Sequence, residues 1–294
     1  MYTIKHQKEG NSLIIEHTEK SIFGKIYLDA GASLQELTLN NHKIIQDLSP
    51  LSYSNTYASS ILFPFANRIK DGKYKFNNEV FQLTKNHKQE ENAIHGFVYN
   101  KTFEIIKQEV NEKYAKVSLE YIENKPSIGF PFTYKLRADY TFSLNSVSLE
   151  ITAMNTSKKA FPFTLGWHPY FTSNNLFNST IEFISDEKIE LGDRNITTGI
   201  ANIKDNSALE IKDKQLDDCW ILNDDKVIFK TPKYNLQFSA SADNNFLQIY
   251  TPPKKNTIAI EPTTGVSDSF NNQIGLKVLE AEASYNVIWT LKIS

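Results

Sequence analysis

The sequence has few of the features that mark membrane, secreted or metal-binding proteins. Cys219 is its only cysteine, which excludes an internal disulfide framework and a metal site built from several cysteines. No apolar run approaches the roughly 18 residues of a membrane-spanning helix, and residues 1–8 lack the apolar stretch of a signal peptide. We therefore expect a cytoplasmic protein with no membrane partner.

An excess of charge of one sign is also missing, and arginine is scarce. The 32 basic and 34 acidic residues leave a net charge of −2, so there is no bulk attraction to nucleic acid or to anionic lipid. The arginines are only Arg68, Arg137 and Arg194. Because arginine is the usual residue for bidentate phosphate recognition, we do not expect a phosphate pocket built from several arginines.

Common cofactor, metal and nucleophile motifs are absent as well. The sequence contains no H-E-x-x-H, no G-x-x-x-x-G-K-[ST], no G-x-G-x-x-G and no G-x-S-x-G pattern. Its six histidines are scattered singly, and no two have the spacing of metal ligands. We expect neither a metal nor an organic cofactor.

The dominant pattern that is present is a hydrophobic period of two. Apolar residues alternate with polar ones over 116–121, 147–153 and 236–240, as in strands with one buried face. Such runs are separated by pairs that we expect to form two-residue hairpin turns: Asn40-Asn41, Asp71-Gly72, Asn77-Asn78 and Asn145-Ser146. The pattern predicts an all-β fold, an antiparallel sandwich or barrel. No linker rich in Pro, Gly or Ser divides the chain, so we expect a single domain over residues 1–294.

Two strand-like segments carry a titratable residue in a similar setting. In 161–171, read as one strand, Thr164, Gly166 and His168 share a face, so small residues leave space beside the imidazole. In 257–262, Glu261 shares a face with Thr257 and Ala259. Each titratable residue precedes a proline, which is expected to end the strand ladder. A histidine and a carboxylate facing one pocket are suited to general acid–base chemistry; a core histidine and a sheet-edge glutamate are the structural alternative.

Three further segments offer polar groups that could hold a sugar. Arg68 lies shortly before the Asp71-Gly72 pair, and its five N–H donors would suit ring and hydroxyl oxygens. His95 precedes Gly96, which permits close backbone approach. Asp217 and Asp218 are adjacent and precede Trp220. Spacing alone does not choose between the two aspartates, and each of the three segments could equally be an ordinary surface or turn.

Taken in order, these segments resemble the aldose 1-epimerase (galactose mutarotase) family. The resemblance spans Asn67 to about Asn272 and rests on five short motifs: Asn67-Arg68-Ile69, His95-Gly96, His168 with Pro169-Tyr170-Phe171, Asp217 in an Asp-x-x-aromatic pattern, and Glu261-Pro262. Each motif is weak by itself, but their order and spacing together are fairly specific.

The resemblance implies a large antiparallel β-sandwich, the galactose mutarotase-like supersandwich, and an isomerase that interconverts the anomers of a free aldose. It implies Glu261 as general base and His168 as general acid, without a cofactor. It also implies Asn67, Arg68, His95 and Asp217 as sugar-binding residues, with Arg68 and His95 as candidates for polarising the ring oxygen. The expected partner is a small aldose, and the chain is expected to be a monomer or a homodimer.

The sequence departs from the family's best-known members in two places. Trp167 precedes His168 where those proteins usually have asparagine, and Phe97 replaces the second glycine after His95. The resemblance therefore does not predict a preference for galactose. A hexose-6-phosphate 1-epimerase, a glycoside hydrolase using Glu261 with Asp217, and a non-catalytic sugar-binding protein are the alternative functions.

Overall fold

The computed structural model describes residues 1–17, 19, 21–204, 208–242 and 245–294. Strands dominate these ranges, and neighbouring strands in the three large sheets run antiparallel. The prediction of an all-β fold is confirmed. No helix in the described part of the chain is long and apolar enough to span a membrane.

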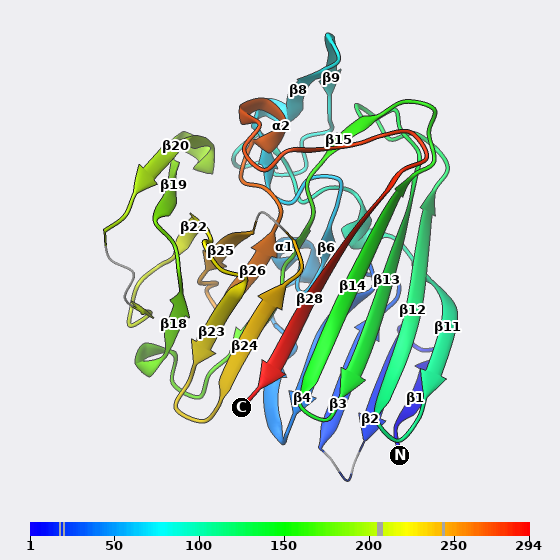
Figure 1. The fold of residues 1–294 in the computed structure, drawn as a ribbon, viewed down its shortest axis with the longest axis vertical. Helices are drawn as coiled ribbons and strands as arrows, with labels where there is room; N and C mark the ends of the chain where they lie inside the picture. Colours follow the sequence, from blue (N-terminus) through cyan, green and yellow to red (C-terminus); the bar gives the residue numbers. More distant parts are fainter. Residues whose placement is uncertain (18, 20, 205–207, 243–244) are drawn as a thin grey trace.

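The largest sheet has nine strands and forms one layer of the molecule (Figure 1). In spatial order its strands are β11 (Glu104–Val110), β12 (Tyr114–Glu123), β13 (Tyr134–Ser143), β14 (Ser146–Asn155), β28 (Ser284–Ile293), β24 (Asn235–Ala240), β23 (Lys226–Lys230), β18 (Thr180–Phe183) and β21 (Leu209–Glu210).

Two further sheets make up most of the opposite layer. The five-stranded sheet contains β1 (Thr3–Gln7), β2 (Ser12–His17), β3 (Ile22–Tyr27), β4 (Ser33–Leu39) and β5 (His42–Ile45). The eight-stranded sheet has the order β20 (Thr197–Asn202), β19 (Glu187–Leu191), β22 (Asp217–Ile221), β25 (Phe246–Tyr250), β26 (Thr257–Thr263), β16 (Gly166–Trp167) and β6 (Ile61–Leu62), with β17 (Tyr170–Thr172) also paired to β26.

Short elements complete the described structure. The two-stranded pairs are β7 (Arg68–Ile69) with β10 (Ala93–Ile94), β8 (Lys73–Phe76) with β9 (Glu79–Gln82), and β15 (Phe161–Phe163) with β27 (Lys277–Leu279). The α-helices are single turns, α1 (Tyr53–Thr56) and α2 (Ser269–Asn272), and 3₁₀ turns cover Lys70–Gly72, Val98–Asn100, Leu176–Asn178 and Asp193–Asn195.

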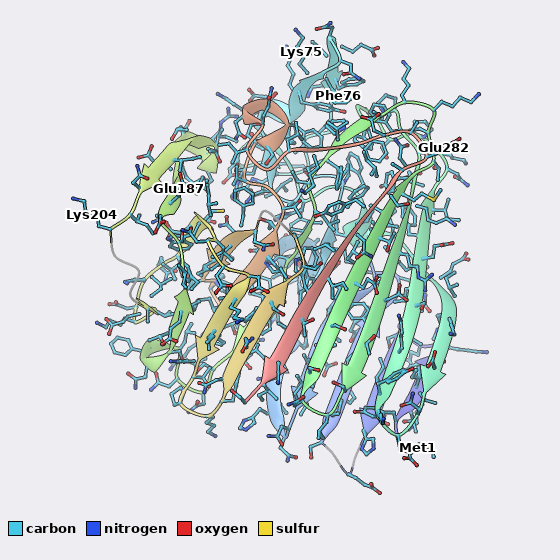
Figure 2. All side chains as sticks on the ribbon, viewed as in Figure 1. Met1, Lys75, Phe76, Glu187, Lys204 and Glu282 are labelled. Carbon is cyan, nitrogen blue, oxygen red and sulfur yellow. The ribbon has the colours of Figure 1, made fainter. Side chains whose placement is uncertain are left out.

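Aromatic side chains join the layers, and side chains fill the space between them (Figure 2). Phe142 of β13 lies against Gly24 of β3 so closely that a Cβ at Gly24 would come within 2.5 Å of the ring. Phe171 of β17 packs edge-on against Phe238 of β24, with ring centroids 4.9 Å apart. The nine-stranded sheet is thus covered by the five-stranded sheet on one part and by the eight-stranded sheet on another.

The alternation seen in the sequence matches the burial of the strands. Along β14, every second residue from Val147 to Asn155 is buried. Hairpins form at Asn40-Asn41 and Asn77-Asn78, where both residues of each pair have positive φ. The pair predicted at Asn145-Ser146 was one residue off, because Ser143 pairs directly with Ser146.

Three other local predictions were wrong. The Asp71-Gly72 pair has positive φ but does not form a hairpin, because β7 and β8 pair with other strands. Residues 161–171 are not one strand: the backbone N–H of Thr164 bonds to Pro64 and that of Leu165 to Thr264 Oγ1, so the chain changes partners between β15 and β16. Glu261 does not end its strand, because β26 continues to Thr263.

Candidate active site

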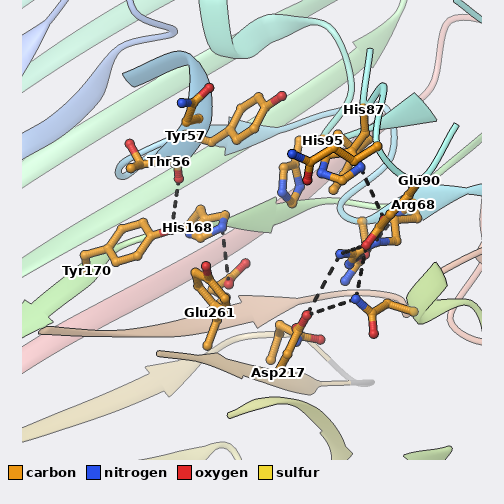
Figure 3. A pocket seen from close by; sticks show the side chains of 17 residues that line it. Thr56, Tyr57, Arg68, His87, Glu90, His95, His168, Tyr170, Asp217 and Glu261 are labelled. Atoms are coloured by element: carbon orange, nitrogen blue, oxygen red, sulfur yellow. Dashed lines mark hydrogen bonds and ion pairs between the residues drawn. The ribbon is translucent and has the colours of Figure 1, made fainter. Parts of the chain in front are cut away.

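A pocket of 290 Å³ opens beside the middle of β26, and all six residues singled out from the sequence line it. This volume is at the small end of the range for ligand pockets, about 300–1,000 Å³, and suits a monosaccharide. Figure 3 shows His168 beside Glu261 on one side of this pocket, with Arg68 and Glu90 across from them. These six residues are Asn67, Arg68, His95, His168, Asp217 and Glu261.

The register of β26 places His168 opposite Glu261. Gly166 of β16 lies opposite Thr263, and Tyr170 of β17 lies opposite Ala259. Counting two residues inward from either pair brings His168 and Glu261 face to face, although Pro169 interrupts the strand. His168 Nε2 is 3.4 Å from Glu261 Oε1, and the two side chains are only 6% and 4% exposed. Cross-strand neighbours on one face interact directly, so the sheet itself fixes this pair.

Burial changes the protonation of both members of the pair. It lowers the pKa of His168 to about 3, because the imidazolium would lose its hydration. The pKa of Glu261 is raised well above its ordinary value, first by burial and then by the nearby Asp217, with Arg68 opposing. The ring of His168 stacks on Tyr170 at 4.9 Å, and its Nδ1 has no hydrogen-bond partner among the described residues. Burial therefore favours the uncharged form of both groups, an imidazole facing a carboxylic acid.

Arg68 lies across the pocket with most of its donors already engaged. Its Nε and Nη2 donate to the two carboxylate oxygens of Glu90 at 2.6 and 3.1 Å, and Nη1 donates to Asn67 Oδ1 at 3.1 Å. Its backbone carbonyl accepts from the N–H of Asp268 at 2.7 Å. Of the five N–H donors of a guanidinium, one on Nη1 and one on Nη2 make no hydrogen bond within the described residues, although Nη2 also lies 3.9 Å from Asp217 Oδ2.

The structure distinguishes the two adjacent aspartates. Asp217 faces the pocket, where its Oδ1 accepts from Gln248 at 2.8 Å and its Oδ2 from Asn195 at 3.3 Å. Asp218 points to the other face of β22 and pairs with Lys188 at 2.6 Å. Burial raises the pKa of Asp217, with Arg68 opposing. Only Asp217 can contact a ligand in the pocket.

His95 is held in the pocket wall by an unusual backbone. Both His95 and Gly96 have positive φ, 63° and 68°, and the buried imidazole places Nδ1 2.9 Å from the carbonyl oxygen of Ala66. Because a carbonyl oxygen only accepts, Nδ1 carries the proton. Burial keeps the pKa of His95 well below its ordinary value, so the ring is neutral. Its Nε2 can accept a hydrogen bond from a hydroxyl but carries no proton to donate to a ring oxygen, which disagrees with the expectation that His95 polarises that oxygen.

Several lining residues were not found from the sequence. Glu90, Asn195 and Gln248 hold Arg68 and Asp217, and Tyr170 supports His168. The Pro169-Tyr170-Phe171 motif beside His168 contains Tyr170, but the sequence did not predict its contact with the imidazole. The other three are isolated polar residues without a motif, and their partners are 22 to 105 residues away in the chain.

The remaining arginines do not add a phosphate clamp to the pocket. Arg137 pairs with Asp139 at 2.7 Å on β13, and Arg194 pairs with Asp71 at 2.8 Å. Neither lines the pocket, and no lysine lines it among the described residues. Within the same residues, no group of three or more His, Cys, Asp or Glu side chains converges as a metal site would.

Comparison with known proteins agrees with this fold. A model of the aldose 1-epimerase family matches residues 23–292. The chain is 24% identical over 277 residues to YihR of Escherichia coli (strain K12), described as uncharacterized, covering 89% of this chain and 87% of that protein. A galactose mutarotase-like protein from Clostridium acetobutylicum superposes with a TM-score of 0.88 at 19% identity, covering 100% of this chain and 98% of the other. A galactose 1-epimerase from Lactobacillus acidophilus gives 0.81 at 19% identity with the same coverage.

Proposed function

The chain belongs to the aldose 1-epimerase family, and from that premise we propose that it interconverts the α and β anomers of a free aldose. His168 and Glu261 act as the proton-transfer pair. The observation that carries the proposal is their position: two titratable side chains, buried and 3.4 Å apart, face each other in a sugar-sized pocket. A protein that only bound sugar would not need this pair.

The reaction balances with these two groups and no cofactor. Glu261 accepts the proton of the anomeric hydroxyl, the O1–H electrons form the C1 carbonyl, and the C1–O5 bond breaks with its electrons staying on O5. His168 gives its proton to O5. Rotation about the C1–C2 bond presents the other carbonyl face, and closure with the proton transfers reversed yields the opposite anomer.

The cycle requires one proton shared between the two groups. A neutral imidazole with a carboxylic acid and an imidazolium with a carboxylate have the same net charge and differ by one proton transfer. Burial favours the first arrangement. Sugar hydroxyls stabilise the second, because dipoles act strongly on charges in a medium of low dielectric constant. Substrate binding thus prepares Glu261 as base and His168 as acid.

The other lining residues hold the ring in place. Asp217 accepts hydrogen bonds from sugar hydroxyls, and neutral His95 accepts another through Nε2. The two free N–H groups of Arg68 are the donors suited to the ring oxygen or a neighbouring hydroxyl. Asn67 binds Arg68 through its side chain and His95 through its carbonyl oxygen, so its proposed part in sugar binding is mainly indirect.

Polarimetry of freshly dissolved α-glucose, α-galactose and a pentose tests the proposal. The wild-type protein should accelerate mutarotation above the spontaneous rate. Glu261→Gln and His168→Asn should each lower kcat by roughly 10²–10⁴-fold, while sugar affinity measured by calorimetry stays within about tenfold. Their double variant should lose much less than the product of the single losses, because both residues serve one cycle.

Glu79→Gln is the matched control for Glu261→Gln. Glu79 is exposed on β9, where it forms a long ion pair of 3.9 Å with Lys159, and it does not line the pocket, so kcat should not change. Wild-type kcat in Glu261→Gln on every aldose tested would show that Glu261 is not the base. Sugar binding without any wild-type turnover would instead support a non-catalytic binding protein.

A further inference from the structure

Glu90 occupies the position on Arg68 that a substrate carboxylate would take. Its two oxygens receive the Nε and Nη2 donors at 2.6 and 3.1 Å, a bidentate contact, and the two side chains are 12% and 18% exposed. The planar guanidinium fork is the protein group best matched to carboxylates and phosphates. An internal carboxylate bound there competes directly with an anionic ligand.

Other contacts keep Glu90 in this place. Its Oε1 also accepts from Asn195 at 3.2 Å, its Oε2 is 3.4 Å from His87 Nδ1, and its backbone carbonyl accepts from Arg194 at 3.1 Å. Burial alone would raise the pKa of Glu90, but its hydrogen bonds and ion pair with Arg68 outweigh burial and lower it. Glu90 thus remains ionised and attached to Arg68 at neutral pH.

The charges around the pocket do not favour an anion. Among the described lining residues, Arg68 is the only arginine or lysine, and it is opposed by Glu90 and Asp217. The His168–Glu261 pair adds no net charge when it holds one proton. When the histidines and Glu261 are left out of the count, one positive and two negative side chains line the pocket. Charges of this kind act on an approaching anion over several ångströms.

We propose that Glu90 is the specificity-determining residue that restricts this site to uncharged aldoses, by occupying the fork of Arg68 that would otherwise bind a uronic acid or a sugar phosphate. This inference rests on the proposed mutarotase function. Glu90 does not take part in the proton transfers. Its removal is therefore expected to change which sugar is accepted more than how fast an accepted sugar reacts.

Replacement of Glu90 provides the main test, with glucose and glucuronate as probes. In Glu90→Gln, the ratio of kcat/KM for glucuronate to that for glucose should rise at least tenfold over wild type, mainly through KM for glucuronate. Glu91→Gln is the control, because it removes the same charge from the next residue, which is 69% exposed and forms an ion pair with Lys85 at 3.6 Å. An unchanged ratio in folded Glu90→Gln, or an equal rise in Glu91→Gln, would overturn the proposal.

A second measurement uses only the wild-type protein and so does not depend on the variant folding. Raising the salt concentration screens charge–charge interactions. If the pocket repels anions, kcat/KM for glucuronate should increase with salt while that for glucose stays constant. A decrease for glucuronate would mean that a cationic group captures the carboxylate, and the inference would fail.

Failure of the mutarotase proposal would be visible separately. If the wild-type protein turns over no aldose, that proposal is wrong, and the same comparison is then made on dissociation constants from calorimetry. Tighter glucuronate binding in Glu90→Gln relative to glucose would still support the role of Glu90, and an unchanged preference would refute it.

Discussion

Burial acts in opposite directions on the two residues of the proposed proton-transfer pair. It favours the uncharged form of each, so the pKa of His168 falls and that of Glu261 rises. A buried carboxyl group without a fixed cationic partner is costly to ionise. The site therefore carries a stability cost that depends on pH, and this cost can be measured apart from activity.

Glu261→Gln should stabilise the fold increasingly as pH rises. The pKa of Glu261 is raised in the folded protein above its ordinary value of 4.5. Its favourable contribution is therefore complete below pH 4.5 and is lost as pH rises through the folded-state value. Glutamine does not titrate, so its contribution to stability does not change with pH. The Tm of the variant minus that of wild type should therefore grow from pH 4 to pH 8. The Tm should rise by about 2–4 °C for each kcal/mol by which the substitution increases the free energy of unfolding.

Differential scanning calorimetry at several pH values measures this difference. Glu79→Gln on the surface should show a small offset that does not change with pH. A difference that shrinks with rising pH would contradict the direction of the Glu261 shift.

The same protonation states predict an unusual acid limb for activity. The pair needs one proton: with two it has no base, and with none it has no acid. Because burial lowers the pKa of His168 to about 3, the second proton should bind well below the ordinary imidazole range near 6.5. Wild-type kcat/KM should therefore not fall between pH 6.5 and pH 4.5, provided that circular dichroism shows the protein folded. An acid limb with an apparent pKa between 6 and 7 would contradict this.

At the scale of elements, the wall carrying His95 depends on close backbone contact at Gly96. Gly96 forms a bridge with Phe63, and a Cβ there would lie 2.0 Å from the Phe63 carbonyl oxygen. Gly96→Ala should destabilise the protein by at least about 2 kcal/mol more than Gly10→Ala. Gly10 has a similar positive φ of 75° but open space around it. Gly10→Ala therefore measures only the cost of placing alanine at a positive φ, about 1–2 kcal/mol.

Urea denaturation and polarimetry together check this prediction. Gly10→Ala should retain wild-type mutarotation, whereas Gly96→Ala should lose activity as well as stability, because His95 moves with its neighbour. Equal destabilisation by the two substitutions would mean that the segment has room to shift.

The elements also show which parts of the structure can be predicted from the sequence. Alternation identified the long strands, such as β14, because one buried face imposes a period of two. It could not identify the breaks around His168, because these arise where the backbone changes partners to Pro64 and Thr264, about 100 residues away in the chain. Long-range pairing of this kind leaves no local pattern.

In the site, too, residues in local motifs could be predicted and residues that depend on long-range contacts could not. Its six predicted residues belong to short motifs, and the structure brings them into one pocket; their roles remain predictions. Glu90 and Asn195 belong to no motif, and their significance comes only from distant partners, Arg68 and Asp217. Spacing alone does not choose between Asp217 and Asp218; the Asp-x-x-aromatic motif of the resemblance favours Asp217, and the structure places Asp217 on the pocket face of β22.

At the scale of the whole molecule, we propose that the chain folds as one domain. One continuous hydrophobic core contains residues from all three large sheets, such as Leu13 of β2, Leu149 of β14 and Ile260 of β26. Splitting the chain between sheets would expose this shared core. Unfolding of the whole chain should accordingly be a single cooperative step.

A sugar that fits the pocket should raise the Tm of that single step. The pocket is assembled from segments between Asn55 and Glu261, so the unfolded chain has no site and only the folded state gains binding energy. At ten times the dissociation constant the gain is about 1.4 kcal/mol, or a few degrees in Tm. Differential scanning fluorimetry with glucose, galactose and a pentose measures the shift, and sorbitol, an open-chain polyol of similar size, controls for general solute effects.

Glu261→Gln should keep the shift, because it retains the hydrogen-bonding groups, whereas Arg68→Ala should reduce it. An equal shift with sorbitol would contradict specific binding of the ring, and two transitions of which only one moves would contradict the single domain.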